Sequence, residues 1–310
     1  MDKEEISIAA VVVTYNRLEK LKKTLSSYER QVRKPDYLIV VNNASTDGTA
    51  AFLQQFHQKS ILNVIIVNTE KNLGGSGGFY LGEEAALKTD ADWIMIADDD
   101  LYVGENYIEG LVKRIHEHEE NEVAIICGAV EERGKYSSVH RSKSTHKLFE
   151  LGFHEPVGES AYKKEVFEPD FVSYLAIMIN RMALEKAGLV QKDFFIWNDD
   201  TEHVFRLKKY GKILCYPQYL CYHDVDKENS SLSWKNYYGY RNTLYFYREH
   251  YKLLFPIKTM VFIARTLLSF LRGHTVEEFR LRFAAIKDAW IGKLGKNTKY
   301  KPGWKPSRIN

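Results

Sequence analysis

Three consecutive aspartates, Asp98, Asp99 and Asp100, follow a short apolar run from Trp93 to Ala97. The run predicts a buried strand with the aspartates at its carboxyl end. Like charges this close raise one another's pKa unless a cation or several hydrogen-bond donors lie among them. A solvated acidic turn is one explanation. In open α/β sheets, however, ligands bind at the carboxyl ends of strands, which favours a site for a hard divalent cation that shares its remaining positions with substrate phosphates.

A second acidic stretch lies about a hundred residues later, where Asp199, Asp200 and Glu202 follow Trp197 and Asn198. The pattern predicts that Asn198 caps a helix with the acids in its first turn, where the helix dipole favours negative charge. One acid would be enough for capping. Three acids beside a tryptophan therefore indicate a second functional centre.

A loop with four glycines in five residues begins at Gly74 and opens a helix. Such a loop can admit a phosphate or simply make a tight turn. Its spacing fits neither a P-loop nor a dinucleotide-binding fingerprint, and no lysine follows it. Another polar turn, residues 42–49, follows the second apolar run.

These candidate residues lie at the ends of regularly alternating elements. Strands are expected at residues 6–13, 37–41, 63–67, 93–97, 123–130, 171–179, 213–216 and 219–222, with helices after most of them and Asn16 as the cap of the first helix. This alternation predicts an α/β fold with a doubly wound, mostly parallel sheet. Residues 131–165 show little periodicity and are expected to form a loop or hairpin. The sequence indicates no function for this segment.

The composition changes near residue 226, which predicts two regions, residues 1–225 and 226–310. Trp234 to Tyr247 are expected to form an aromatic helix that packs on the sheet domain. Leu253 to Leu271 is strongly apolar but is broken by Pro256, so it suits a helix that packs on protein or lies in a membrane interface. Basic residues follow to the end of the chain.

The overall composition narrows the class of protein. A net charge of +3 is too small to indicate nucleic acid as a partner. Three cysteines without metal-ligand spacing suit a reducing compartment, and the first residues do not resemble a signal peptide. No uncharged apolar run reaches 18 residues. A cytoplasmic protein is expected.

Four motifs then occur in the order found in a known family: VVVTYNR at 11–17, NNASTD at 42–47, DDD at 98–100 and WNDDTE at 197–202. Over residues 6–225 the chain resembles inverting family-2 glycosyltransferases with the GT-A fold. The glycine loop, the second acidic stretch, His223 and the Tyr237 to Asn242 segment are most similar to bacterial galactofuranosyltransferases.

This resemblance implies roles for individual residues. The residues implied in nucleotide-sugar binding are Thr14, Arg17, Asn42, Asn43, Gly74, Gly75, Asp98 and Asp99. Many relatives have aspartate where this chain has Asn42, so its contact with the uracil is the weakest of these assignments. Asp98, Asp100 and His223 would hold Mg²⁺ or Mn²⁺. Asp200 would be the general base with Asp199 beside it, and Trp197, Glu202 and Arg241 would bind the acceptor.

The function implied is transfer of galactofuranose from UDP-galactofuranose to a bacterial surface glycan or lipid-linked acceptor. A dTDP-rhamnose-dependent rhamnosyltransferase shares most of these motifs. A nucleotide-sugar-binding protein without turnover would have no use for a base, and a nucleotidyltransferase normally carries a lysine-containing glycine loop after its first strand. Residues 253–310 are expected to allow peripheral contact with the inner face of the cell membrane.

Overall fold

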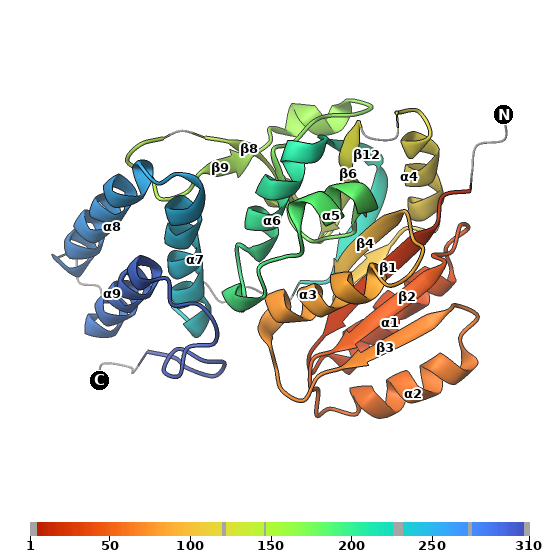
Figure 1. Cartoon of the computed structure of the whole chain (residues 1–310), viewed down its shortest axis with the longest axis horizontal. Coiled ribbons are helices and arrows are strands. Elements are labelled where there is room, and N and C mark those ends of the chain that lie inside the picture. Colours follow the sequence, from red (N-terminus) through yellow and green to blue (C-terminus); the bar gives the residue numbers. More distant parts are fainter. Residues whose placement is uncertain (1–4, 120–121, 146, 226–231, 272–274, 307–310) are drawn as a thin grey trace.

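The computed structural model describes residues 5–119, 122–145, 147–225, 232–271 and 275–306. Its first part alternates strands and helices (Figure 1). The elements are β1 (Ile8–Thr14), α1 (Leu18–Glu29), β2 (Tyr37–Asn42), α2 (Thr49–Lys59), β3 (Val64–Asn68), α3 (Gly74–Ala86) and β4 (Trp93–Asp98). The strands pair in parallel in the order β3-β2-β1-β4. All carboxyl ends of these strands therefore lie at one edge, as the sequence predicted.

The sheet continues beyond β4 with strands of both directions. The further elements are β5 (Leu101–Val103), α4 (Tyr107–Ile115), β6 (Val123–Glu132), β11 (Ile177–Asn180), α5 (Arg181–Ala187), α6 (Asp199–Leu207) and β12 (Lys212–His223). The full order is β3-β2-β1-β4-β11-β6-β12-β5, with β11 and β5 antiparallel to their neighbours. The predicted α/β fold with a mostly parallel sheet is confirmed.

Both faces of the sheet are covered by helices. Ile8, Ala10 and Val12 of β1 belong to a buried cluster with side chains of α1, α2 and α4. The alternate residues Ala9, Val11 and Val13 belong to a second cluster with side chains of α3, α5 and α6. Because successive side chains of a strand point to opposite faces, a continuous apolar strand fits only a sheet buried on both sides.

The segment 131–165 is more ordered than predicted. β6 turns back through a hairpin into β7 (Lys135–Tyr136), which the prediction of a loop or hairpin allowed. Beyond it, β8 (Arg141–Ser144), β9 (His154–Pro156) and β10 (Phe171–Val172) form a separate three-stranded antiparallel sheet. Short 3₁₀ turns occur at Ser138–His140 and Glu159–Lys163.

Three strand predictions were wrong in their extent. The expected strand 171–179 is split between β10 and β11, which belong to different sheets, because the chain bends near Ala176 with a φ of 54°. The two strands expected at 213–216 and 219–222 form the single strand β12, with an irregularity between Tyr216 and Leu220. β5 was not predicted.

Of the two predicted asparagine caps, Asn16 was wrong, whereas Asn198 stands at the predicted position with Asp199, Asp200 and Glu202 in the first turn but makes no cap bond. Arg17 occupies the cap position of α1, while the Asn16 side-chain oxygen accepts a hydrogen bond from the Thr46 N–H. The Asn198 amide nitrogen donates instead to Gly239 and Thr243 of a later helix, and this long-range contact wins over local capping.

Three helices follow the sheet region and stand together at the left of Figure 1: α7 (Trp234–His250), α8 (Leu254–Leu271) and α9 (Val276–Ile291). As expected, the aromatic helix α7 packs on the rest of the protein, with the rings of Phe246 and Phe153 stacked at 4.1 Å between centroids. The predicted boundary at residue 226 falls at residues 226–231, which lie outside the described residues. Division into two domains therefore stays a proposal.

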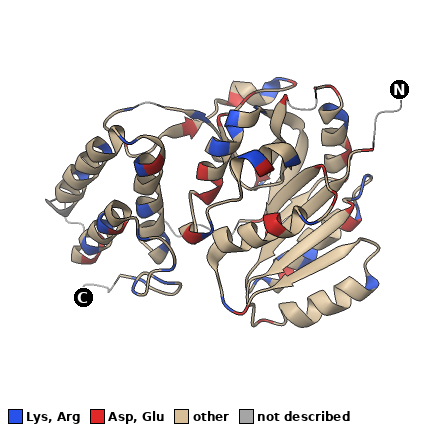
Figure 2. Cartoon of the chain, in the orientation of Figure 1, with Lys and Arg blue, Asp and Glu red and all other residues tan. Residues whose placement is uncertain are grey.

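α8 carries few charged residues. In Figure 2 it is mostly free of charged residues, with isolated basic positions. Among the described residues, none of the helices combines the length and the hydropathy needed to cross a bilayer.

Candidate active site

A pocket of about 210 Å³ opens at the carboxyl ends of β1 and β4. Seven of the eight residues expected to bind a nucleotide sugar line it, namely Thr14, Arg17, Asn43, Gly74, Gly75, Asp98 and Asp99. The eighth, Asn42, is buried nearby, with its amide nitrogen 2.9 Å from Asn68 Oδ1. Tertiary structure therefore brings residues from four loops around one space.

A larger hollow of about 640 Å³ lies elsewhere, bordered among others by His118, Lys164 and Lys212. Lys212 begins β12, whereas His223 ends it. The hollow contains none of the predicted site residues and lies toward the amino end of that strand, where ligands of open sheets do not usually bind. The smaller pocket is therefore the better candidate.

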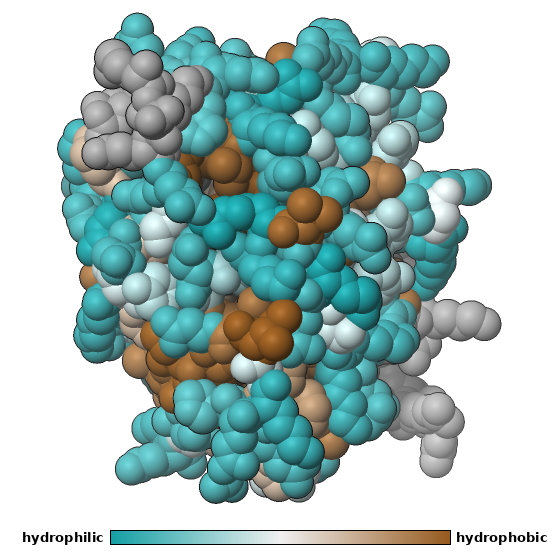
Figure 3. Space-filling view, turned by 90° about the vertical axis from the view of Figure 1, so that its right-hand side faces the viewer, coloured by the Kyte–Doolittle hydropathy of each residue, from teal (hydrophilic) through white to brown (hydrophobic). Residues whose placement is uncertain are grey.

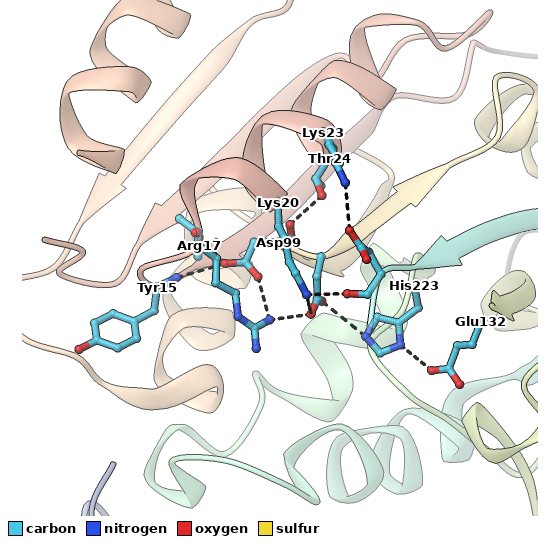
Figure 4. A network of polar contacts seen from close by, with 11 residues as sticks. Tyr15, Arg17, Lys20, Lys23, Thr24, Asp99, Glu132 and His223 are labelled. Atoms are coloured by element: carbon cyan, nitrogen blue, oxygen red, sulfur yellow. Dashed lines mark hydrogen bonds and ion pairs between the residues drawn. The ribbon is translucent and has the colours of Figure 1, made fainter. Parts of the chain in front are cut away.

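Asp99 fastens the first loop to β4. Thr14 Oγ1 donates to Asp99 Oδ2 at 2.7 Å, the Tyr15 N–H donates to the same oxygen at 3.3 Å, and Arg17 Nη1 lies 3.2 Å from Oδ1 (Figure 4). Burial raises the pKa of Asp99 to about 6, although Arg17 and Thr14 act in the opposite direction. Asp99 thus shapes the wall of the pocket.

Asp100 meets His223 because β5 pairs with the end of β12. Leu101 is the register partner of His223, which leaves Asp100 Oδ1 3.5 Å from His223 Nε2. Arg17 Nη1 donates to the other oxygen at 2.6 Å (Figure 4). Burial alone would raise the pKa of Asp100, but the hydrogen bond with His223 and the charge of Arg17 outweigh it and lower that pKa. Of the three consecutive aspartates, Asp100 is therefore the one whose charged form is favoured.

Asp98 is an aspartate whose charged form is strongly disfavoured. Burial raises its pKa well above the ordinary value, and repulsion from Asp100 and Asp99 adds to the effect. The charges of Arg17 and His223 oppose this rise. Two carboxylates and an imidazole at one strand edge are a donor set that suits Mn²⁺ or Mg²⁺. Among the described residues, the group whose ligand atoms lie within 4.8 Å of one another is Glu132, His140 and His223, so Asp98 and Asp100 with His223 stay a predicted ligand set.

The glycine loop is held in place by Asn43. Its Oδ1 accepts from the Leu73 N–H and its Nδ2 donates to the Gly74 carbonyl, each at 2.9 Å. Gly74 has a φ of +78°, a conformation that glycine adopts without strain. Gly74 and Gly75 of this loop therefore line the pocket.

The predicted general base lies at the start of α6. Thr201 donates to Asp200 Oδ1 from its backbone N–H at 2.7 Å and from its hydroxyl at 3.1 Å. Burial raises the pKa of Asp200, although the Thr201 bonds oppose the rise. Burial and repulsion from Asp200 raise the pKa of Asp199 to about 7. A carboxylate tuned in this way can accept a proton near neutral pH.

The loop that carries Trp197 has a constrained backbone. Phe195, Trp197 and Asn198 have φ values of 70°, 65° and 64°. Asn242 of α7 stabilises this shape by donating from Nδ2 to the carbonyl oxygens of Phe194, Ile196 and Trp197 at 3.1, 3.0 and 2.8 Å. Trp197 remains 43% exposed, with part of its ring packed beside Gly239 of α7.

The comparison with known protein families identifies the family of this chain. Residues 9–187, more than half of the chain, match the family model described as Glycosyl transferase family 2. The chain belongs to glycosyl transferase family 2.

Relatives of this family 2 chain include the galactofuranosyltransferase GlfT1 of Mycobacterium tuberculosis (strain CDC 1551 / Oshkosh), 39% identical over 94 residues. That match spans only 30% of this chain and 30% of the relative. The dTDP-rhamnosyl transferase RfbF of Shigella flexneri is 24% identical over 306 residues, which cover 93% of this chain and 97% of the relative. The relatives thus include one named for galactofuranosyl transfer and one named for rhamnosyl transfer.

Solved structures support the fold. The crystal structure of GalNAc-T7 with UDP, GalNAc and Mn²⁺ superposes with a TM-score of 0.65 at 14% identity, covering 94% of this chain and 57% of the other. At this identity the likeness concerns the fold alone. The expected GT-A architecture is confirmed.

Two residues expected at the acceptor side of the family 2 site have other partners. The Glu202 carboxylate lies 2.9 Å from both Arg206 Nε and His250 Nε2. Burial would raise its pKa, but these partners lower the pKa to about 2. The buried Arg241 guanidinium donates to the carbonyl oxygens of Gly295 and Phe194. These contacts hold Glu202 against α6 and α7 and hold Arg241 against the carbonyl groups of Phe194 and Gly295, and their acceptor-binding role stays a prediction.

Three residues near the site were missed. Lys235 lines the pocket, and its Nζ lies 6.0 Å from the centre of the Trp197 ring. Burial lowers the pKa of Lys235, and the charge of Arg17 adds to the effect. Glu132 and His140 lie beside His223. Only their contacts with distant residues distinguish them from other charged residues, so the sequence carried no signal for them.

Proposed function

We propose that this family 2 protein is an inverting glycosyltransferase that takes its sugar from a nucleoside diphosphate donor, with a divalent metal and Asp200 as general base. The observation that carries the proposal is the pocket in which Asp98 and Asp99 lie with Arg17 and the glycine loop. Acidic metal ligands, a cation and exposed backbone at one strand edge are what a diphosphate leaving group requires.

Each part of the pocket has a task in that reaction. Asp98, Asp100 and His223 would hold Mn²⁺ or Mg²⁺, which when bound supplies Lewis-acid stabilisation of the leaving diphosphate. Arg17 and Lys235 add positive charge at the same pocket. These two side chains line the pocket whether or not a metal is bound.

Inversion follows from a single displacement. Asp200 would accept the proton of the attacking acceptor hydroxyl, while the exposed ring of Trp197 supports the acceptor sugar. No carboxylate nucleophile is required, since the sugar is never attached to the protein. The raised pKa of Asp200 suits a base that works near neutral pH.

For the donor we propose UDP-galactofuranose. The 39% identity with GlfT1 supports this choice, although it covers 94 residues only. The alternative is dTDP-rhamnose, supported by the relative RfbF, whose match covers 93% of the chain at lower identity. Asn42 does not help to distinguish the bases, because its side chain is bonded to Asn68.

The acceptor would be a surface glycan or its lipid-linked precursor at the inner face of the membrane. An exposed apolar stripe supports membrane contact. It consists of Leu253, Ile257, Met260, Leu267 and Leu268, all on or next to α8. Exposed Lys252 and Arg265 flank the stripe, a pattern that suits an anionic lipid surface. The opposite end of the molecule is mainly hydrophilic, with apolar patches set among hydrophilic side chains (Figure 3).

A donor competition experiment tests the proposal. The protein is incubated with Mn²⁺ and either UDP-galactofuranose or dTDP-rhamnose, and both nucleotide release and the mass of an acceptor glycan are measured. We expect turnover with UDP-galactofuranose, inhibited by UDP far better than by dTDP. Turnover with dTDP-rhamnose alone would establish the alternative, and no nucleotide release from either donor would contradict both proposed donors.

A further inference from the structure

Glu132 joins two imidazoles next to the proposed metal site. Its Oε1 lies 2.7 Å from His223 Nδ1 and 2.9 Å from His140 Nε2, and its Oε2 accepts from Ser137 Oγ at 2.7 Å. The other nitrogen of His223, Nε2, lies 3.5 Å from Asp100 Oδ1. Figure 4 shows His223 between Glu132 and the aspartates. Both carboxylate oxygens of Glu132 are therefore occupied.

The sheet explains how these residues meet. β6 and β12 run in parallel with Glu131 opposite Tyr222, so Glu132 lies beside His223. The hairpin to β7 and the turn at Ser138–His140 bring His140 back over the same strand end. The His140 ring packs edge-on against the His223 ring, with 5.5 Å between centroids.

The trio could itself be considered a metal site, because one ligand atom from each of Glu132, His140 and His223 lies within 4.8 Å of the others. The hydrogen-bond distances argue against this. At 2.7 and 2.9 Å both imidazole nitrogens are placed to donate N–H groups to the carboxylate. An ion there would need both nitrogens without protons and would remove both bonds.

We infer that Glu132 is a positioning residue that holds the His223 ring through Nδ1 and so keeps Nε2 on the side of Asp100, where Nε2 would bind the ion. A carboxylate behind a histidine ligand fixes its tautomer and orientation in this way. His140 and Ser137 in turn fix the Glu132 carboxylate. The inference rests on the proposed metal-dependent function, since the ion is what His223 Nε2 would bind.

Metal affinity is the direct test. Free Mn²⁺ is measured by electron paramagnetic resonance in titrations of the full chain with UDP present, for the wild type, Glu132→Ala and Glu132→Gln. We expect Glu132→Ala to weaken Mn²⁺ binding by about 10- to 100-fold. Glu132→Gln keeps one acceptor oxygen and should lie between the two. The matched control is Glu131→Gln, the neighbouring carboxylate on the other face of β6, which should bind Mn²⁺ like the wild type.

A second readout reports the imidazole itself. In ¹⁵N-histidine spectra recorded with diamagnetic Mg²⁺ and UDP present, with His223 assigned from His223→Gln, the wild type should show His223 protonated at Nδ1 and not at Nε2. Glu132→Ala should show a mixture of tautomers. Thermal unfolding monitors the fold, and if Glu132→Ala does not fold, Glu132→Gln and His140→Asn carry the same measurements.

These readouts need no sugar donor, so they stay valid if the proposed glycosyl transfer fails. Unchanged Mn²⁺ affinity and an unchanged tautomer in folded Glu132→Ala would overturn the inference. It would equally be overturned if Glu132→Ala lost a bound Mn²⁺ that Asp100→Asn retained, because the trio would then be a separate metal site. In activity assays, excess Mn²⁺ should restore the Glu132→Ala rate, which it would not do for a purely structural defect.

Discussion

Gly74 and Phe195 are in direct backbone contact, since a Cβ on residue 74 would lie 1.9 Å from the Phe195 carbonyl oxygen. The Ser76 N–H donates to that same oxygen at 3.3 Å. The glycine loop on the donor side therefore serves as the surface on which the Trp197 loop is built. The glycine loop and the loop that leads to Trp197 are therefore in direct contact at one wall of the pocket.

Gly74→Ala should cost more than about 3 kcal/mol of unfolding free energy and abolish activity, because it adds a backbone clash to a strained φ. Gly134 is the matched control, with a φ of +77° and no atom within 4 Å of an added Cβ. Gly134→Ala should cost only about 1–2 kcal/mol. Urea unfolding of both variants measures the difference. Equal losses would mean that the contact with Phe195 is unimportant.

Asp100→Asn should abolish transfer, as should removal of divalent metal with EDTA, because a charged ligand opposite the leaving diphosphate is lost. The comparison variant is Asp170→Asn. Asp170 does not line the pocket, and its Oδ1 lies 3.8 Å from Lys143 Nζ. This variant should retain activity. Rates are measured with and without added Mn²⁺. Full activity of the wild type in excess EDTA would refute metal dependence.

Asp200→Asn should lower the transfer rate by about 100-fold or more while donor binding is preserved, since only proton acceptance is removed. Asp199→Asn is the adjacent control, and its effect should be smaller. Single-turnover rates and UDP binding are measured for both variants. A nearly normal Asp200→Asn with an inactive Asp199→Asn would move the base to Asp199.

The transfer rate should fall as the pH is lowered, and the fall should begin at a higher pH than a free aspartate would give. A base must be unprotonated, and burial raises the pKa of Asp200, so protonation begins at a higher pH than for a free aspartate. The neighbouring Asp199, with a pKa of about 7, contributes in the same direction. The profile of kcat/KM against pH is recorded at saturating Mn²⁺, so that metal loading stays constant. A rate that is flat between pH 8 and pH 5 would contradict a buried base.

The protein should float with anionic liposomes at low salt, and a triple variant Leu253→Ser, Ile257→Ser, Met260→Ser should not. The reason is the loss of apolar area from the exposed stripe, while the basic residues that make binding salt-dependent remain. Ile61, 73% exposed at the end of α2, provides the control Ile61→Ser. Absence of wild-type binding at low salt would remove membrane contact from the proposed function.

Local sequence was enough to predict the strands and their ends. The apolar run before Asp98 predicted a buried strand with the aspartates at its carboxyl end, and the buried strand β4 confirms this. Four short motifs in order indicated the family, which the family match confirmed. In the same way, the apolar β1 required helices on both faces of the sheet. Each of these inferences depends on residues that are neighbours in the chain.

Tertiary structure decided everything that depends on pairing between distant segments. β5, three residues long and without a strand signal, brings Asp100 to His223, and β6 brings Glu132 to the same histidine. The Asn198 side chain makes no cap bond, and its amide nitrogen donates to Gly239 and Thr243 of α7 instead. Arg241 and Glu202 found partners within the fold. Periodicity and spacing report burial and local conformation, whereas the partner of a polar side chain is set by which distant backbone the whole fold places beside it.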